Sequence, residues 1–458
     1  MNPGKIVEAP AMTESLKISP QYKAWEPRTT LDFDMQGGFA RAVEMCSGMA
    51  ECRKKLDGTM CPSYMGTLDE EHSTRGRANA LRNAISGIAP QQEFTGKRLY
   101  EVMDLCLECK ACKAECPSNV DMAKLKYEFL DHYHRANGLP LRNRMFAGVE
   151  TLNRIGSKLA PLSNWIANSS LNRRLMEIAF GVDRRRPLPA FAGETFEGWF
   201  RSHRAEGDGS KGEVVLFHDT FNNFNTPNVA IAATRFLEKS GYRVLLAEKK
   251  CCGRPMISKG MLSRAKENAA WNVERLARYA EQGTPIVGLE PSCLLTLRDE
   301  YPEFIRTGAA KKIATASFLF DEFVAREIKA ERLVFRSSGN GKKALLHGHC
   351  HQKALVGTAT TVAMLKAAGY DVGEVDSGCC GMAGSFGFEK EHYDLSTKIA
   401  NRRLIPAVKA ASPDVEVVAA GISCRQQIDH LAGRKAKHPA ELLWEGLGRA
   451  GRGEVGRV

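Results

Sequence analysis

The fourteen cysteines of this 458-residue chain constrain its fold and function more than any other feature. They fall into four groups: Cys46, Cys52 and Cys61; Cys106, Cys109, Cys112 and Cys116; Cys251, Cys252 and Cys293; and Cys350, Cys379, Cys380 and Cys424. Cysteines that serve only as small apolar core residues would be scattered along the chain. The N-terminal stretch lacks the apolar segment of a secretory signal, so we expect a reducing, cytoplasmic environment. There, grouped cysteines predict metal or redox ligands rather than structural disulfides.

Length and charge set further limits. The length predicts about two to four domains, and no run of about 18 apolar residues is present that would span a bilayer. The formal net charge of +12 favours an anionic membrane or an acidic protein as partner. Nucleic acid is not an expected partner, because we find neither an aromatic-interleaved basic patch nor zinc-finger spacing. We therefore expect a location in the cytoplasm, or at the inner face of the cytoplasmic membrane.

The second cysteine group has the complete spacing of an iron–sulfur ligand run. The stretch CLECKACKAECP follows the pattern C-x2-C-x2-C-x3-C-P, with Cys106, Cys109, Cys112 and Cys116 at its cysteine positions. Thiolates are soft donors that suit iron, and this short spacing lets one loop supply three ligands. A structural zinc site would usually pair one C-x2-C with a second, distant pair. The spacing therefore favours a 4Fe-4S cluster over zinc.

The first group is an incomplete run of the same kind. The stretch MCSGMAECRKKLDGTMCPSY has Met49 at the position where the second cysteine is expected. In two-cluster ferredoxins the fourth cysteine of each run binds the other cluster. That rule assigns one cluster to Cys61, Cys106, Cys109 and Cys112, and a second cluster to Cys46, Cys52 and Cys116.

The second cluster so assigned lacks one thiolate. Either it is a three-iron cluster, or a non-cysteine residue completes a four-iron cluster, or no cluster forms and the thiols are structural. The thioether of Met49 is a poor ligand for ferric iron, whereas imidazole replaces thiolate in some clusters. The nearest histidine, His72 in DEEHSTRGRA, is therefore the candidate extra ligand. The alternative for His72 is a solvated or helix-capping role.

Hydrophobic periodicity predicts a multidomain α+β protein, with an all-helical N-terminal domain followed by a duplicated α/β domain. The stretch STRGRANALRNAISG predicts a helix that begins at Ser73 or Thr74 and stops at Gly87. The stretch DMAKLKYEFLDHYHRANG predicts a second helix that ends at Gly138. The predicted units are a tail at 1–30, a helical domain at 31–136, a basic helical connector at 137–210, two repeats at 211–336 and 337–446, and a tail at 447–458.

The connector is strongly basic. Residues 135–186 carry ten Lys or Arg against three acids. Its pattern is helical and amphipathic, and the residues predicted on apolar faces are Trp165, Ile166, Leu171, Leu175 and Ile178. The segment is either a connector with a solvated basic face or a docking surface for an anionic membrane or a partner subunit.

The C-terminal part is a duplication. Short apolar runs alternate with helical patterns from Lys211 onward, which predicts α/β units around a parallel or mixed sheet. The stretches RFLEKSGYRVLLAEKKCCGRPM and AMLKAAGYDVGEVDSGCCGMAG align at an offset of 128 residues and superpose their Cys-Cys-Gly motifs. Cys293 and Cys424 follow in the two copies at an offset of 131. An internal repeat of this kind predicts two copies of one structural unit.

Repeat two carries the more complete ligand set. Its cysteines, which follow three predicted strands, are Cys350, Cys379, Cys380 and Cys424. Because the carboxyl ends of parallel strands meet at one edge of a sheet, we expect these four thiols to converge on a metal. One of the flanking histidines, His349 or His351, is expected to face the site because neighbours on a strand alternate.

Repeat one has Thr220 where repeat two has Cys350. It retains Cys251, Cys252 and Cys293. This repeat therefore binds a three-thiolate cluster, or binds zinc, or is a copy that has lost its site.

These motifs resemble known iron–sulfur proteins. The paired Cys-Cys-Gly repeats are similar to the CCG, or cysteine-rich, domain of heterodisulfide reductase and of the iron–sulfur subunits of glycolate, D-lactate and anaerobic glycerol-3-phosphate dehydrogenases. The stretch from GGFARAVEMCSGMAECRK to GTMCPSYMGTLDEEHSTRGRANALR resembles the C-terminal half of fused FAD-linked D-2-hydroxyglutarate and D-lactate dehydrogenases. The resemblance covers residues 36–445, and in that family the gap at Met49 is a shared trait.

The resemblance implies an oxidoreductase component: an iron–sulfur electron-transfer subunit of a flavin-dependent dehydrogenase for D-2-hydroxyglutarate, D-lactate or glycolate. No flavin-type glycine-rich turn precedes Cys46, so FAD is expected on a partner dehydrogenase subunit. The expected acceptor is a quinone or a soluble carrier, with a peripheral membrane contact. The expected cofactors are two clusters in the ferredoxin-like domain, one of them 3Fe-4S in one alternative, and a further cluster or zinc in the CCG domain.

Two other functions remain open at this point. In the first, the chain is heterodisulfide reductase-like and its CCG domain itself reduces a disulfide or a quinone. In the second, zinc stabilises the CCG domain as a scaffold, and only the ferredoxin-like part is redox-active.

Overall fold

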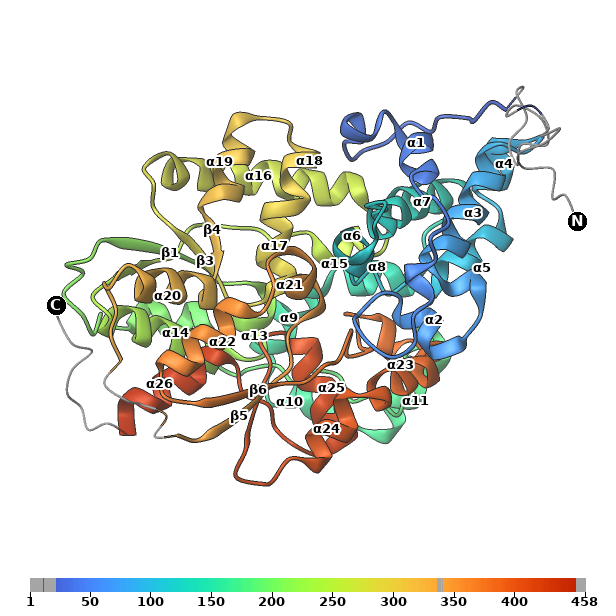
Figure 1. The fold of residues 1–458 in the computed structure, drawn as a ribbon. Coiled ribbons are helices and arrows are strands. Elements are labelled where there is room, and N and C mark those ends of the chain that lie inside the picture. The colour runs from blue at the N-terminus through green and yellow to red at the C-terminus, as the bar shows by residue number, and fades with distance from the viewer. Residues whose placement is uncertain (1–10, 12–21, 336–338, 340, 450–458) are drawn as a thin grey trace, which may run out of the picture.

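The computed structural model describes residue 11, residues 22–335, residue 339 and residues 341–449. Most of the two predicted tails, 1–30 and 447–458, lies outside these residues. The N-terminal helices lie at one end of the molecule and pack against two α/β units that carry the rest of the chain (Figure 1). This arrangement confirms the predicted fold class, whereas the exact domain boundaries remain predictions.

The N-terminal part is all-helical in the described residues. Its elements are η1 (Asp34–Gln36), α1 (Phe39–Glu44), η2 (Glu51–Arg53), α2 (Pro62–Thr67), η3 (Glu70–His72), α3 (Thr74–Ile85), α4 (Pro90–Phe94), α5 (Lys97–Asp104), α6 (Ala111–Glu115) and α7 (Met122–Asn137). The side chain of Ser73 caps α3 by accepting a hydrogen bond from the backbone of Gly76. Helix α7 ends at Gly138, whose positive φ of 86° suits glycine. The start of α3 and the end of α7 therefore lie where the sequence predicts them. The end of α3 differs, because this helix stops at Ile85, two residues before Gly87.

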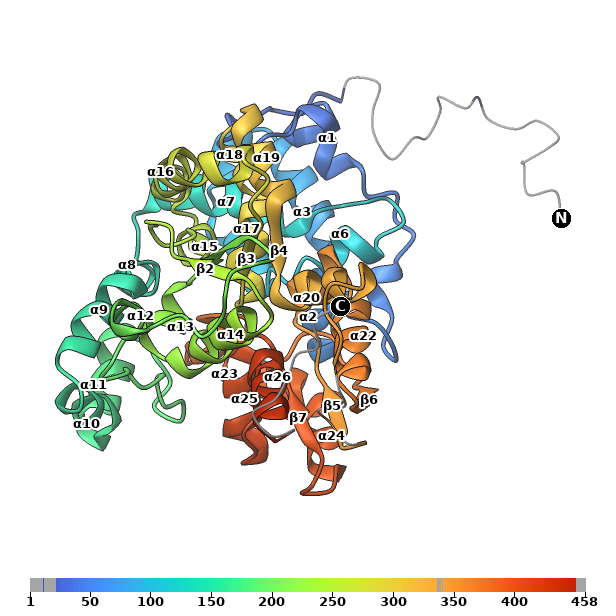
Figure 2. The same cartoon turned by 90° about the vertical axis from the view of Figure 1, so that its left-hand side faces the viewer.

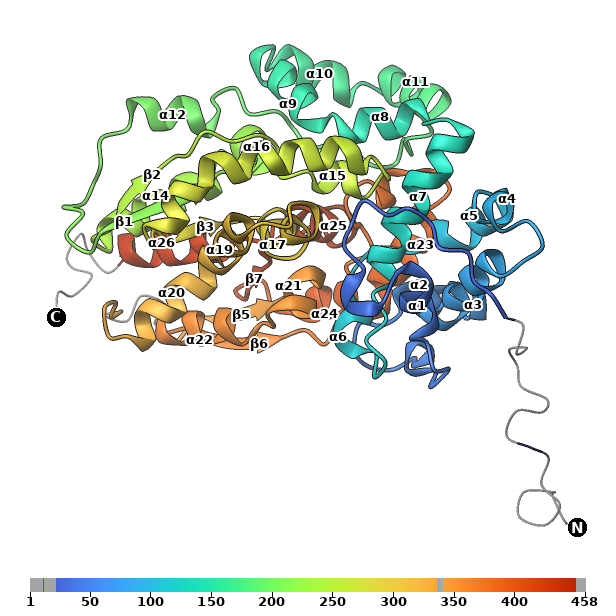
Figure 3. The ribbon, with the colours of Figure 1, turned by 90° about the horizontal axis from the view of Figure 1, so that it is seen from above.

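A helical segment then crosses to the α/β part. It contains α8 (Leu141–Ala147), α9 (Val149–Lys158), α10 (Leu162–Asn168), α11 (Ser170–Phe180) and α12 (Phe196–Ser202). Helices α8 to α11 lie along one side of the molecule (Figure 3). No residue of α10 or α11 is buried.

The first α/β unit has a four-stranded parallel sheet in the order β2-β1-β3-β4. Its strands are β1 (Glu213–Phe217), β2 (Arg243–Leu245), β3 (Ile286–Gly288) and β4 (Ser317–Leu319). Its helices are α13 (Thr220–Phe224), α14 (Pro227–Lys239), α15 (Arg254–Ile257), α16 (Leu262–Glu281), α17 (Pro291–Asp299), α18 (Tyr301–Phe304), α19 (Gly308–Ala316) and α20 (Phe320–Lys329). Four consecutive residues of β1 are buried, as expected where helices cover both faces of a parallel sheet.

The second unit repeats this plan with a three-stranded parallel sheet in the order β6-β5-β7. Its strands are β5 (Lys343–Leu346), β6 (Asp371–Glu374) and β7 (Glu416–Val418). Its helices are α21 (Cys350–Leu355), α22 (Ala359–Ala367), η4 (Phe386–Phe388), α23 (Tyr393–Arg402), α24 (Leu404–Ala410), α25 (Ile422–Ala432) and α26 (Pro439–Arg449). One apolar core contains Val214 of β1 together with Leu346 of β5, so the two repeats fold against each other.

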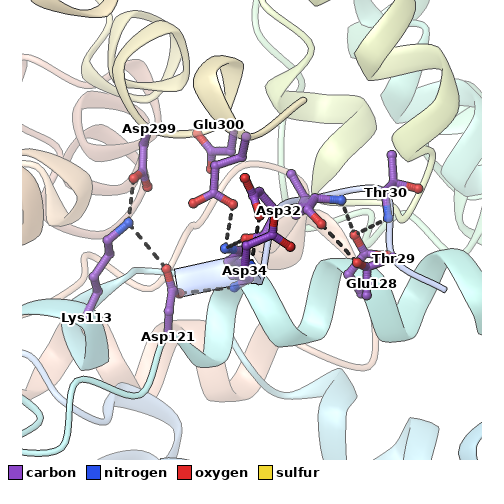
Figure 4. A network of polar contacts seen from close by, with 12 residues as sticks. Thr29, Thr30, Asp32, Asp34, Lys113, Asp121, Glu128, Asp299 and Glu300 are labelled. Atoms are coloured by element: carbon purple, nitrogen blue, oxygen red, sulfur yellow. Dashed lines mark hydrogen bonds and ion pairs between the residues drawn. The ribbon is translucent and has the colours of Figure 1, made fainter. Parts of the chain in front are cut away.

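Buried ion pairs join the N-terminal helices to repeat one (Figure 4). Asp299 at the end of α17 accepts from both Lys110 and Lys113, and Glu300 also pairs with Lys110. The Lys110 side chain is only 2% exposed. Burying a lysine is costly unless its charge is compensated, so these contacts fix how the two parts pack together.

A second ionic contact joins α5 to repeat two. Nε2 of His392 lies 2.8 Å from Oδ2 of Asp104, and its Nδ1 lies 3.2 Å from Oε2 of Glu389. Burial alone would lower the pKa of His392, but the hydrogen bonds to the two carboxylates outweigh it and raise that pKa to about 9. Glu389 also forms ion pairs with Arg142 of α8 and with Lys259, which follows α15.

This histidine predicts a pH dependence of stability. Because the pKa of His392 rises from 6.5 to about 9 on folding, its contribution is fully present below about pH 6.5 and is lost as the pH rises through about 9. The contribution is of order 3 kcal/mol. His392→Gln should therefore lower the thermal midpoint near neutral pH and flatten its fall between these two pH values, as followed by circular dichroism under anaerobic conditions. An unchanged slope in His392→Gln would refute the assignment.

Candidate metal centres

Four cysteines line one small cavity in the N-terminal part. They are Cys61, Cys106, Cys109 and Cys112. Cys61 directly precedes α2, and the other three come from the loop between α5 and α6 and from α6 itself. Cys109 lies between Glu108 and Lys110. Both of these neighbours have positive φ, so the loop turns sharply around the Cys109 thiol. The structure thus brings together the four residues that the crossed ferredoxin pattern assigns to one cluster.

The electrostatics of this cavity suit a metal rather than free thiols. Burial raises the pKa of Cys106, Cys109 and Cys112, so these thiols stay protonated unless a cation compensates their charge. One compensating group is the buried guanidinium of Arg77, whose Nη1 lies 3.6 Å from Sγ of Cys61. The donor set therefore fits an iron–sulfur cluster, and the role of each thiol as a ligand remains a prediction.

Three cysteines line a second cavity, close to the first. They are Cys46, Cys52 and Cys116, and Met49 lies in the wall beside them. The backbone N–H of Arg75 donates to Sγ of Cys52 over 3.3 Å, a contact that favours a thiolate. Cys116 has crossed from the second run to join the first, as in two-cluster ferredoxins.

His72 does not line this second cavity. It ends η3, where its Nδ1 lies 2.9 Å from the hydroxyl of Thr67 on α2. Its carbonyl oxygen accepts from Ser63 and Arg77. The turn that leads into α3 therefore holds His72 against α2, and the structure does not bring this candidate extra ligand to the cavity.

The four cysteines of repeat two converge at the carboxyl edge of its sheet. Thiol contacts link Cys350 to Cys379, Cys379 to Cys380, and Cys380 to Cys424. These contacts lower the pKa of Cys380, whereas thiol contacts and burial raise the pKa of Cys379 and Cys424. The four thiols therefore do not all ionise unless a cation lies among them. Glycines permit the close packing: a Cβ on Gly421 would come within 2.4 Å of the His349 ring.

His347 is a site residue that the sequence analysis missed. Its imidazole and the sulfurs of Cys380 and Cys424 all lie within 4.8 Å of one another. Its Nδ1 lies 2.7 Å from the hydroxyl of Ser377, while its buried Nε2 has no hydrogen-bond partner among the described residues. A signal was present in the sequence, because His347 is the first residue after β5 and begins the stretch HGHCH.

The flanking histidines differ from expectation. The structure places Cys350 at the first turn of α21 rather than at a strand end, and Nδ1 of His349 caps that helix. Because this segment is the start of a helix, the alternation of side chains along a strand does not apply to it. Both His349 and His351 line the same cavity, where only one of them was expected. Nε2 of His351 lies 2.9 Å from the carbonyl oxygen of Glu108, so it reaches the N-terminal part.

Repeat one gathers only three thiols. Cys251, Cys252 and Cys293 are all buried, and Cys252 contacts both of the others. Thr220 begins α13 as Cys350 begins α21, and its buried hydroxyl has no hydrogen-bond partner in the part of the chain that the structure describes. The residues present fit a three-thiolate site.

A cavity of about 250 Å³ separates the N-terminal part from repeat two. Cys106 and Glu108 line it on one side, and Cys350, Cys379 and Cys380 line it on the other. The rest of its wall is mixed: aromatic and aliphatic residues such as Phe146, Phe191 and Phe386 alternate with charged ones such as Lys126, Arg254 and Glu389. The two thiol sites are neighbours, because Cys106 and Cys350 line this one cavity and Nε2 of His351 hydrogen-bonds the carbonyl oxygen of Glu108.

Comparison with known proteins identifies the two kinds of domain that carry these thiols. Residues 42–121 match the model of a 4Fe-4S dicluster domain, and residues 215–298 and 346–429 each match the model of a cysteine-rich domain. The chain is 30% identical over 322 residues to one subunit of the anaerobic glycerol-3-phosphate dehydrogenase of Escherichia coli K12, an alignment that covers 67% of this chain and 77% of that protein.

Two further relatives cover more of this chain. D-2-hydroxyglutarate dehydrogenase of Escherichia coli K12 is 26% identical over 97% of this chain, which spans only about half (47%) of that protein. A probable glycolate oxidase iron-sulfur subunit of Bacillus subtilis is 24% identical, over 85% of this chain and 91% of its own length. The chain therefore belongs to the family of iron–sulfur proteins that join a 4Fe-4S dicluster domain to a duplicated cysteine-rich domain.

Proposed function

We propose that this chain is the electron-transfer part of a dehydrogenase that oxidises a 2-hydroxy acid of the D-2-hydroxyglutarate, D-lactate or glycolate class. It takes electrons from a flavoprotein partner and passes them to an acceptor, either a quinone or a soluble carrier. The observation that carries this proposal is the cavity shared by Cys106 of the ferredoxin-like part and Cys350 of repeat two, which puts the two sets of thiols next to each other. The proposed location is the cytoplasm, at or near the inner face of the cytoplasmic membrane.

Each part of the chain has a distinct task in this proposal. Iron–sulfur clusters, when bound, supply one-electron carriers whose potentials span roughly −700 to +450 mV. The protein buries the thiols of both parts, and Arg77 places a positive charge beside Cys61. The hydrogen bond from His351 to Glu108 holds the loop of Cys109 against repeat two. The cavity between them is the proposed acceptor site, because it touches both sets of thiols.

A second function also needs a test, because Cys350, Cys379 and Cys380 themselves line that cavity. In this alternative, repeat two is catalytic and reduces a disulfide or a quinone, as in a heterodisulfide reductase-like protein. The two functions differ in the oxidant that the reduced protein accepts.

The test uses the whole chain, purified without oxygen. Free reduced flavin should bleach its visible absorbance, and a short-chain, water-soluble quinone should restore it. Absorbance that reduced flavin leaves unchanged would refute electron transfer. Recovery with a small disulfide but not with a quinone would instead favour the alternative.

We also propose that the second N-terminal cavity holds a three-iron cluster, bound by Cys46, Cys52 and Cys116. His72→Ala should then leave the iron content and the electron paramagnetic resonance spectrum unchanged, because the imidazole contacts Thr67 instead of this cavity. Cys52→Ser is the matched positive control and should abolish the three-iron signal. A changed signal in His72→Ala would show that His72 is a ligand after all.

A further inference from the structure

Exposed apolar side chains concentrate on three consecutive helices. Among the described residues sixteen large apolar side chains are exposed, and nine of them lie on or between α9, α10 and α11. These nine define the α9–α11 face: Leu152, Ile155, Leu159, Leu162, Trp165, Ile166, Leu171, Leu175 and Ile178. Trp165 is 72% exposed and Ile178 is 82% exposed. Soluble surfaces rarely gather so many large apolar groups unless they bind something.

The helices that carry this face contact the rest of the protein through few side chains. Met176 and Phe180 of α11 pack, partly buried, against the core of repeat two, and Asn164 of α10 hydrogen-bonds the backbone of Phe191. Helices α10 and α11 have seven and eleven residues and bury none of them. Helices this short are marginal in water unless an apolar face packs against something. They lie at a corner of the molecule, away from the N-terminal helices (Figure 2).

The charges around the face are mostly positive. Residues 149–186 contain seven Lys or Arg and three Asp or Glu. All three acids are paired locally, Glu150 with Arg154, Glu177 with Arg184 and Asp183 with Arg185. Arg186 is buried, so six of the seven basic residues remain at the surface. Lys158 and Arg174, which lie close to the apolar residues in sequence, are exposed. An apolar face bordered by basic side chains matches the boundary between acyl chains and anionic headgroups.

We infer that the α9–α11 face docks on an anionic lipid surface, with its helices in the plane of the interface. None of the described helices is both long and apolar enough to cross a bilayer. Trp165 has the amphipathic ring that is enriched at membrane interfaces. The exposed basic residues favour lipid over a neutral apolar partner because each gains attraction from acidic headgroups.

Docking there would bring the large cavity to the lipid. Leu152 belongs both to the α9–α11 face and to the cavity wall, and Met145, Phe146 and Val149 continue that wall along α8 and α9. An apolar acceptor dissolved in the membrane would then reach the thiols of repeat two without crossing water. This consequence rests on the proposed electron-transfer function, whereas lipid binding itself does not.

Vesicle sedimentation of the whole chain tests the inference. Vesicles of equal parts phosphatidylglycerol and phosphatidylcholine should bind the protein, and vesicles of phosphatidylcholine alone should bind it much more weakly. The double variant Trp165→Glu/Ile178→Glu should lose binding. Lys158→Gln/Arg174→Gln should weaken it by about thirtyfold, from about 1 kcal/mol for each basic residue. Ile88→Glu, at a fully exposed apolar residue between α3 and α4, is the matched control and should bind normally.

Three results would overturn the inference. These are equal affinity for the two kinds of vesicle, unchanged binding by the Trp165→Glu/Ile178→Glu variant, or a wild-type oligomer that this variant converts to monomers. The last result would show that a second copy of the chain covers the face. Reduction of a water-soluble quinone should be normal in both double variants, so a failure of electron transfer is measured separately from a failure of lipid binding.

Discussion

Cys109→Ser should remove one cluster and stop electron flow through the chain. Cys109 lines the four-thiol cavity and follows Glu108, whose carbonyl oxygen accepts a hydrogen bond from His351 of repeat two. Mutating a residue that merely supports a metal ligand costs about 10–100-fold in affinity or activity, so loss of a ligand should cost more. We expect the variant to lose about four iron atoms per chain. Its transfer of electrons from reduced flavin to a quinone should fall by more than about a hundredfold.

The control for this variant is Met103→Leu. Met103 is fully buried on α5, and the exchange conserves its volume, so it disturbs the same core without touching a thiol. Iron content and electron flow should stay near wild type in the control. If Cys109→Ser also keeps both, the relay through this site is wrong.

Cys379→Ser should separate electron entry from electron exit. Cys379 contacts both Cys350 and Cys380, so its loss should disrupt the ligand set of repeat two. The ferredoxin-like cavities do not include it, and their iron should remain. Reduced flavin should therefore still bleach the variant, while reoxidation by quinone should slow by at least about tenfold.

Cys251→Ser is the matched variant, since Cys251 occupies the same position in repeat one. It should lose only the metal of repeat one and keep rapid reoxidation, because Cys251 does not line the large cavity. Metal content that is unaffected by Cys379→Ser would mean that the four converging thiols do not form a metal site.

Local patterns predicted much of the fold and the grouping of ligands. Ser73 and Gly138 delimit helices because capping and left-handed turns depend on residues close in sequence. The structure places Cys61 and Cys116 in different cavities, which is the arrangement that the crossed rule requires, while the assignment of each thiol to a cluster stays a prediction.

Features that depend on packing between distant segments could not be predicted. The contact of His72 with Thr67 arises because η3 turns toward α2, which no spacing encodes. His347 meets Cys380 and Cys424 only after three strands assemble. The large cavity forms between parts of the chain that are far apart in sequence, where Glu108 meets His351.

The number of iron atoms per chain tests the central claim most directly. That claim is that the chain is a multi-cluster electron carrier, with two clusters in its N-terminal part and a metal site in repeat two. Anaerobically purified protein, analysed for iron and zinc by mass spectrometry, should contain about seven or more iron atoms per chain, from one four-iron and one three-iron cluster before any metal in the repeats is counted. Fewer than about four iron atoms per chain, with zinc making up the remaining metal, would contradict it.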